Sequence, residues 1–210
     1  MTVFGTLRRV IFAAALVPAA ALVYGAFTDD LSANPIDYIT DTTGTTALTF
    51  LIITLTITPL RRLTGRNEII RLRRMLGLFA FFYGSLHFAT YIWLDQFFDL
   101  PEIVKDVIKR PFITVGFASF VLLIPLALTS NRAMIIFLGK QWQRLHRAVY
   151  LATIGGVIHF LWLVKADNGE PLLYGLILTV LLGYRLVEGL GSKTAGGLRS
   201  RVGSLVRNQN

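Results

Sequence analysis

Residues 142–162, WQRLHRAVYLATIGGVIHFLW, decide the fold of this 210-residue chain. From residue 145 to about residue 164 the stretch is almost entirely apolar, and an apolar run of about 18 residues or more can cross a bilayer. The stretch also carries His146 near one end and His159 near the other, two of the three histidines in the chain. Ionisable side chains are costly at membrane depth and usually mark functional sites, so these histidines need an explanation.

Five further segments share this apolar character, in a chain that is 54% hydrophobic and only 16% charged. The six segments lie at about 10–27, 44–60, 75–94, 112–130, 145–164 and 172–190. A helix satisfies its own backbone hydrogen bonds inside a bilayer. The sequence therefore predicts an all-α membrane protein, a six-transmembrane-helix bundle that forms one domain over residues 1–210. No internal repeat is apparent, and TTGTT at 42–46 is expected to be a turn before the second helix.

The distribution of charge predicts the orientation of the bundle. Of the 21 lysines and arginines, 17 lie towards the two ends of the chain and in the second and fourth connections, whereas ten of the twelve acidic residues lie in the other connections. Cytoplasmic loops collect Lys and Arg, so both termini are predicted to be cytoplasmic. A basic cytoplasmic face attracts anionic membrane lipids, which accounts for the net charge of +9 without a nucleic acid partner.

His87 and His159 are predicted to lie at the same depth. Each follows the cytoplasmic start of its helix by about 13 residues, or roughly 20 Å. Two neutral imidazoles on facing helices are suitable axial ligands for a haem iron. Gly84 and Gly156 each precede one of these histidines by three residues and share its helix face, which would leave room for a flat macrocycle. The alternative is that the histidines only form hydrogen bonds between helices.

His146 has two possible roles at this stage. It lies near the cytoplasmic boundary in the basic segment QWQRLHR. In such a hydrated interfacial segment the free-energy cost of a histidine side chain is small. On one helix it would be rotated by roughly 140° from His159, because 13 residues are not a whole number of turns. It is therefore either an interfacial side chain or the ligand of a second haem. The chain has no cysteine, so a thiolate metal site and thiol catalysis are excluded.

The sequence resembles the MsrQ family, formerly called YedZ, which belongs to the ferric reductase-like transmembrane group together with the NADPH oxidases. The resemblance extends from about residue 30 to residue 190 and the family's three histidines match His87, His146 and His159. It is carried by ANPIDYITDTTGTTAL (33–48), ITPLRR (57–62), IRLRRMLGL (70–78), SLHFATY (85–91), KRPFITVG (109–116), LALTS (126–130), LGKQWQRLHRAVYL (138–151) and HFLWLVK (159–165).

This resemblance implies a haem-binding electron-transfer subunit of the bacterial inner membrane rather than a catalytic subunit. It implies one or two b-type haems, with FMN and a quinone as further cofactors. Electrons would come from a cytoplasmic flavin reductase or the quinol pool. They would pass to a periplasmic, molybdopterin-containing methionine sulfoxide reductase that repairs oxidised envelope proteins.

The comparison with NADPH oxidases raises a question about the cytoplasmic half. Those proteins carry two histidines on each of two helices, but here the inner position of the third helix falls near Arg73 and Arg74. Arginine stays protonated and cannot ligate iron. Both arginines are instead expected to bind haem propionates, since guanidinium pairs with carboxylates in a bidentate manner. His146 would then ligate an inner haem or lie at a flavin or quinone site.

Two other functions compete with this interpretation. The first is a stand-alone transmembrane reductase of ferric iron or quinol. The second is a transporter with functional histidines, which is disfavoured because the predicted helices show no intramembrane carboxylate or inverted repeat. The sequence also lacks a phosphate-binding glycine loop and a dinucleotide fingerprint, so electrons must be supplied by another protein or by quinol.

Overall fold

The computed structural model describes the backbone of residues 3–164 and 168–207, and the side chains of residues 4–164 and 168–188. Its long helices are α1 (Val3–Thr28), α2 (Pro35–Thr64), α3 (Leu72–Thr90), α5 (Pro111–Leu128), α8 (Ala148–Leu163) and α9 (Gly169–Arg207). Shorter helices are α4 (Leu100–Lys109), α6 (Arg132–Leu138) and α7 (Lys140–Leu145). A 3₁₀ turn (Asn67–Arg71) precedes α3, and a π-helical turn (Tyr91–Asp95) extends it.

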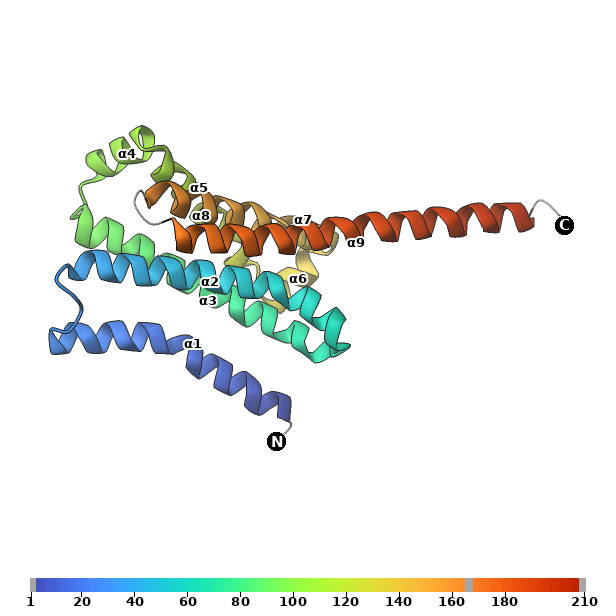
Figure 1. Ribbon diagram of the computed structural model, residues 1–210, viewed down its shortest axis with the longest axis horizontal. Coiled ribbons are helices and arrows are strands. Elements are labelled where there is room, and N and C mark those ends of the chain that lie inside the picture. Colours follow the sequence, from blue (N-terminus) through green and yellow to red (C-terminus); the bar gives the residue numbers. More distant parts are fainter. Residues whose placement is uncertain (1–2, 165–167, 208–210) are drawn as a thin grey trace.

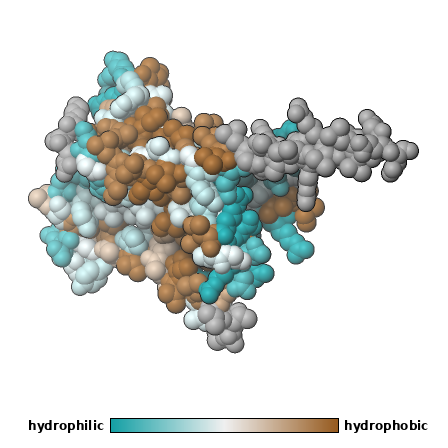
Figure 2. Space-filling view, turned by 45° about the vertical axis from the view of Figure 1, so that its right-hand side comes forward, coloured by the Kyte–Doolittle hydropathy of each residue, from teal (hydrophilic) through white to brown (hydrophobic). Residues whose placement is uncertain are grey.

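The long helices lie side by side, as Figure 1 shows. The connection between α2 and α3 lies at the same end of the bundle as α6 and α7, and α4 lies at the opposite end. In Figure 2 apolar side chains cover much of the middle of the visible face, while hydrophilic groups gather towards its ends. This arrangement is that of a protein surrounded by lipid, and it confirms the predicted all-α membrane class.

Among the described residues, five helices are long and apolar enough to cross a bilayer: Phe4–Thr28, Pro35–Thr64, Asn67–Asp95, Pro111–Leu128 and Gly169–Glu188. The predicted helix at 145–164 is shorter than expected, because the chain turns at His146 and α8 begins only at Ala148. Its 16 residues extend about 24 Å, against roughly 30 Å for a hydrocarbon core. The count of six spans therefore stays a prediction.

Helix α2 begins nine residues before its predicted start at 44. Asn34 caps it through a side-chain oxygen that accepts from the Asp37 backbone N–H, and Pro35 occupies the first turn, where its missing N–H costs nothing. The predicted turn at 42–46 is therefore wrong, because these residues lie inside the helix. The Thr43 hydroxyl donates to the backbone carbonyl four residues earlier, which satisfies it without interrupting the helix.

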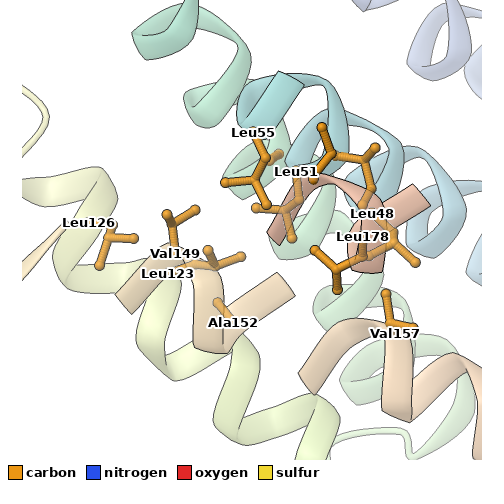
Figure 3. Packing of buried hydrophobic residues seen from close by; sticks show 12 residues of the cluster. Leu48, Leu51, Leu55, Leu123, Leu126, Val149, Ala152, Val157 and Leu178 are labelled. Atoms are coloured by element: carbon orange, nitrogen blue, oxygen red, sulfur yellow. The ribbon is translucent and has the colours of Figure 1, made fainter. Parts of the chain in front are cut away.

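The main hydrophobic core lies between α2, α5, α8 and α9, as Figure 3 shows. It contains buried side chains from all four helices: Leu48, Leu51, Leu55, Leu123, Leu126, Val149, Ala152, Val157 and Leu178. Because lipid tails are as apolar as these side chains, such a core stabilises the bundle mainly through van der Waals packing between the helices. Helix α2 also packs along α3, and α5 packs along α8, and each of these two pairs carries one of the membrane histidines.

Helix α1 is attached to the bundle through Tyr83 of α3, which is completely buried. The Tyr83 hydroxyl donates to the Ala15 carbonyl at 2.7 Å and accepts from the Ala19 N–H at 3.1 Å. In a straight helix these two backbone groups would bond to each other. The hydroxyl is therefore inserted into α1 beside Pro18, where α1 bends in Figure 1.

Candidate functional site

The structure brings His87 of α3 and His159 of α8 together, as their predicted depths require. Their ring centres are 6.1 Å apart and the ring planes are inclined at 78°. A metal bound between two imidazoles lies about 2 Å from each ligating nitrogen, which itself lies about 1 Å from its ring centre, so the two ring centres should be about 6 Å apart. The observed separation leaves room for one metal ion between the two imidazoles.

Hydrogen bonds orient both rings in the same way. Nδ1 of His87 lies 2.9 Å from the Thr40 carbonyl of α2, and Nδ1 of His159 lies 2.7 Å from the Phe112 carbonyl of α5. A carbonyl only accepts, so each Nδ1 carries the hydrogen and donates it. Each Nε2 therefore keeps its lone pair, and partners of this kind fix the ring orientation of metal-ligating histidines.

Two glycines that the sequence reasoning missed lie directly against these rings. A Cβ atom at Gly44 would lie 3.0 Å from Nδ1 of His87, and one at Gly116 would lie 2.7 Å from Nδ1 of His159. Real Cβ atoms almost never approach another atom so closely. The backbones of α2 and α5 thus hold the imidazoles from behind, at a distance that only glycine allows.

The predicted glycines play a different part. Gly84 and Gly156 line the cavity around the two histidines. A Cβ at Gly84 would first meet Phe120 at 3.7 Å, and one at Gly156 would first meet Leu48 at 3.4 Å, both close to ordinary contact distances. They leave open space beside the rings, in agreement with the predicted room for a macrocycle, but they do not contact the imidazoles.

These contacts reveal an internal repeat, which corrects the expectation that there is none. The residues that surround the first imidazole have counterparts around the second, and the members of every pair are 72 positions apart: Thr40 and Phe112, Gly44 and Gly116, Gly84 and Gly156, His87 and His159. The α2–α3 pair and the α5–α8 pair therefore present equivalent surfaces to a group bound between them.

A cavity of about 490 Å³ surrounds the two histidines, within the range of about 300–1,000 Å³ that is usual for ligand sites. Its walls come from α2, α3, α5 and α8 and are mainly apolar, with Leu51, Phe88, Phe117, Phe120, Leu123 and Phe160 among them. Of the other aromatic side chains near the histidines in sequence, Trp162 is 53% exposed and lies outside the cavity.

The end of the cavity near α4 is polar. Three carboxylates line it, Asp37, Asp41 and Asp95, together with Tyr91 and Arg110. Within the described part of the chain, Arg110 is the only lysine or arginine on the cavity wall. None of these residues was predicted as part of the site, although Arg110 lies in the KRPFITVG motif at 109–116.

Arg110 and Tyr91 both lie beside the buried carboxylate of Asp106 at this end. Arg110 is 56% exposed and its Nε lies 3.3 Å from the carboxylate of the buried Asp106, so part of its guanidinium remains available. The Tyr91 hydroxyl is buried close to the Asp106 carboxylate, which interacts with it.

His146 lies apart from this cavity, just after α7. Its ring stacks on Trp142 with ring centres 3.8 Å apart, and its Nε2 lies 3.4 Å from the Ser130 hydroxyl. Arg73 is near enough to interact electrostatically with it, whereas Arg74 lines a second cavity between α1 and α3. The two arginines that were predicted to act together therefore lie in different surroundings.

The described residues contain no group of three or more His, Asp or Glu side chains that could hold a bare metal ion. The site offers two imidazoles as protein ligands, so it suits a metal whose other ligands belong to a bound cofactor. Haem iron takes four nitrogens from its macrocycle and needs only the two axial positions. The imidazole pair and the mainly apolar cavity around it fit this cofactor.

Comparisons with known proteins agree with this geometry. Residues 9–157 match the family model described as ferric reductase like transmembrane component. The chain is 55% identical over 179 residues to the protein-methionine-sulfoxide reductase heme-binding subunit MsrQ of Herminiimonas arsenicoxydans, covering 84% of this chain and 82% of that protein. It is 50% identical to the MsrQ of Bordetella pertussis, with 87% and 89% covered, and 47% identical to that of Xanthomonas euvesicatoria, with 92% and 91% covered. No solved structure is significantly similar to the chain.

Proposed function

The chain belongs to the MsrQ family of ferric reductase-like transmembrane proteins, and we propose that it carries electrons across the membrane on haem b to a methionine-sulfoxide reductase. The observation that carries the proposal is the pair of imidazoles, His87 and His159, 6.1 Å apart across an apolar cavity with both Nε2 atoms free to ligate. Haem b would supply a one-electron couple at this position.

Each part of the cavity has a defined task in this proposal. His87 and His159 bind the iron, and the Thr40 and Phe112 carbonyls hold the two rings in position. Gly84 and Gly156 leave space for the macrocycle. The apolar walls exclude water and keep the local dielectric low, which strengthens the influence of nearby charges on the reduction potential. Arg110 would bind a propionate at the α4 end, through the part of its guanidinium that Asp106 leaves available.

The orientation supports transfer from the cytoplasm outwards. The Arg-rich connection between α2 and α3 lies at the end opposite to α4, and basic loops face the cytoplasm. We place both termini in the cytoplasm and count α8 as the sixth crossing, since it packs along α5 and its histidine faces that of α3. The α4 end of the cavity then opens to the periplasm of a bacterial inner membrane.

The cytoplasmic half receives electrons. His146 is proposed as a ligand of an inner haem or as part of a flavin or quinone site, with FMN or a quinone as the further cofactor. Arg73 is proposed to bind the carboxylate of that group, because it lies close to His146. Arg74 instead lines the cavity between α1 and α3 and is not part of this site. The donor is a cytoplasmic flavin reductase or the quinol pool, and the acceptor is a periplasmic molybdopterin-containing reductase.

The proposal is tested by following the haem absorbance of the chain in lipid vesicles. NADH with a flavin reductase, or a quinol, should reduce the haem. Reoxidation should be fast only when the periplasmic reductase and a methionine-sulfoxide substrate are both present. Reoxidation that is equally fast with a ferric chelate and unaffected by the reductase would identify a stand-alone ferric reductase instead.

Replacing Arg110 by glutamine is expected to lower the reduction potential of the haem. A positive charge nearby stabilises the reduced form, which carries one positive charge fewer, so its loss favours oxidation. The shift should be on the order of tens of millivolts, since about 59 mV correspond to about 1.4 kcal/mol for one electron. Redox titration of the visible spectrum measures it.

Lys109→Gln is the matched control, because Lys109 is exposed, carries the same charge and does not line the cavity. Arg110→Lys keeps the positive charge but loses bidentate pairing with a carboxylate. Its haem should therefore have a reduction potential close to that of the wild type. The haem should nevertheless be easier to extract than from the wild type. Equal shifts in Arg110→Gln and Lys109→Gln would show that Arg110 acts only through the net charge of α4.

A further inference from the structure

A second cavity, of about 430 Å³, lies between α1 and α3. It shares no lining residue with the histidine cavity. Arg8 and Phe12 line it from α1, Arg71 from the end of the 3₁₀ turn, and Arg74, Met75, Leu78, Phe79 and Phe82 from α3. We call it the α1–α3 groove. Three arginines gather at one end, and apolar side chains form the rest.

The arginines of the α1–α3 groove have no anionic partner in the described part of the chain. The three ion pairs found there involve Glu188, Glu102 and Asp106, and none includes Arg8, Arg71 or Arg74. Three like charges around one cavity repel one another. A bound anion removes that repulsion, and guanidinium groups are well suited to the oxygens of a phosphate.

The apolar part of the groove continues along one face of α3. Positions 71, 75, 78 and 82 recur at helical spacing, and the 11 steps from Arg71 to Phe82 extend roughly 16 Å along the axis. Phe12 and Phe79 close the floor, with ring centres 5.2 Å apart. Phe12 and Phe82 are 49% and 39% exposed, so the groove is open between the two helices.

We propose that the α1–α3 groove binds one anionic phospholipid of the cytoplasmic leaflet, with its phosphate among Arg8, Arg71 and Arg74 and an acyl chain against Phe12, Phe79 and Phe82. The charged end lies at the cytoplasmic boundary, where lipid phosphates are found, and basic pockets between transmembrane helices bind such headgroups. A flavin nucleotide also combines a phosphate with an apolar body. The open side of the groove, between two lipid-facing helices, favours the lipid.

The bound lipid would complete the attachment of α1. Apart from the Tyr83 hydrogen bonds at the bend, α1 contacts α3 mainly through apolar side chains such as Phe12 on Phe79. A phospholipid between the arginines of α1 and α3 adds a charged link at the cytoplasmic end. Its role is structural, so it is separable from electron transfer.

The test measures the lipids that remain bound after the full-length protein is purified from bilayers of equal parts phosphatidylglycerol and phosphatidylcholine. Mass spectrometry gives the ratio of the two. Each arginine near the membrane surface favours an anionic lipid by about fivefold, so Arg71→Gln with Arg74→Gln should lower the ratio by about 25-fold. Arg61→Gln with Arg66→Gln removes the same charge from the same connection, outside the groove, and should leave the ratio unchanged.

A second variant keeps all the arginines. Leu78→Trp fills the groove with an apolar ring and should reduce retention of both lipids, while the spectrum of the His87–His159 haem reports that the bundle is intact. If the Arg61/Arg66 control lowered the ratio of phosphatidylglycerol to phosphatidylcholine as much as the Arg71/Arg74 variant, the basic face would attract anionic lipids in general. That result would overturn the proposal. Release of a flavin nucleotide from the Arg71/Arg74 variant, with lipid retention unchanged, would overturn it too.

Discussion

Replacement of His87 by alanine is expected to abolish the spectrum of six-coordinate haem b, and replacement of His159 is expected to remove the same spectral component. In the proposed assignment each change deletes one of the two axial ligands and leaves the other imidazole alone in an apolar cavity. Loss of a mere hydrogen-bond partner of a ligand costs about 10–100-fold in metal affinity, so loss of the ligand itself should cost more. The reduced-minus-oxidised visible spectrum, with haem quantified per protein, measures the effect.

His146→Ala is the internal control for this experiment. His146 does not line the histidine cavity, and its ring is held by Trp142 and Ser130. The His87–His159 component should therefore persist in this variant. Any other component that disappears would report a second haem at the cytoplasmic end. If His146→Ala removed the main component and His87→Ala did not, the assignment of the ligands would be wrong.

Gly116→Ala is expected to disrupt the site although it changes no ligand. The new methyl group would lie 2.7 Å from Nδ1 of His159, closer than carbon and nitrogen can approach. The ring has little freedom to retreat, because Nδ1 also donates to the Phe112 carbonyl. Either the hydrogen bond breaks or the imidazole tilts away from the iron. Haem affinity should fall by about 10–100-fold, the usual cost of disturbing a ligand's support.

Alanine variants at other glycines serve as controls for this prediction. A Cβ at Gly183 of α9 meets nothing within 4 Å, and one at Gly77 of α3 meets only Thr54 at 3.8 Å. Alanine at these positions should keep the haem and strengthen the helix by about 1 kcal/mol at most. Gly44→Ala, with 3.0 Å to the His87 ring, should be intermediate. Haem binding by Gly116→Ala at the wild-type level would mean that the His159 ring has room to move.

The depth of the two ligands was predictable because position across a membrane depends mainly on distance along a helix. Counting residues from the basic end of each helix placed His87 and His159 at one level, and the structure brings their rings within 6.1 Å. The limits of the elements were less predictable. Hydropathy missed the polar start of α2, where Asn34 and Pro35 initiate the helix, and it carried the fifth span through the turn at His146.

The supporting residues could not be found from hydropathy, because they depend on which helices pack together. Gly44 and Gly116 lie on α2 and α5, far in sequence from the histidines that they contact. The 72-residue spacing was present in the sequence all along, but only nine of the residue pairs from 36 and 108 to 88 and 160 are identical. Arg110 drew attention as part of a family motif, and only the structure shows that it reaches the cavity.

The spacing of 72 positions between equivalent contacts divides the site into two halves of the same design. Each pair of helices supplies one imidazole, together with the carbonyl and the glycine that hold it. Because one chain carries both halves, the two imidazoles meet without the assembly of separate subunits. The same spacing relates Arg74 to His146, so the two halves differ in the residue that they place at this position.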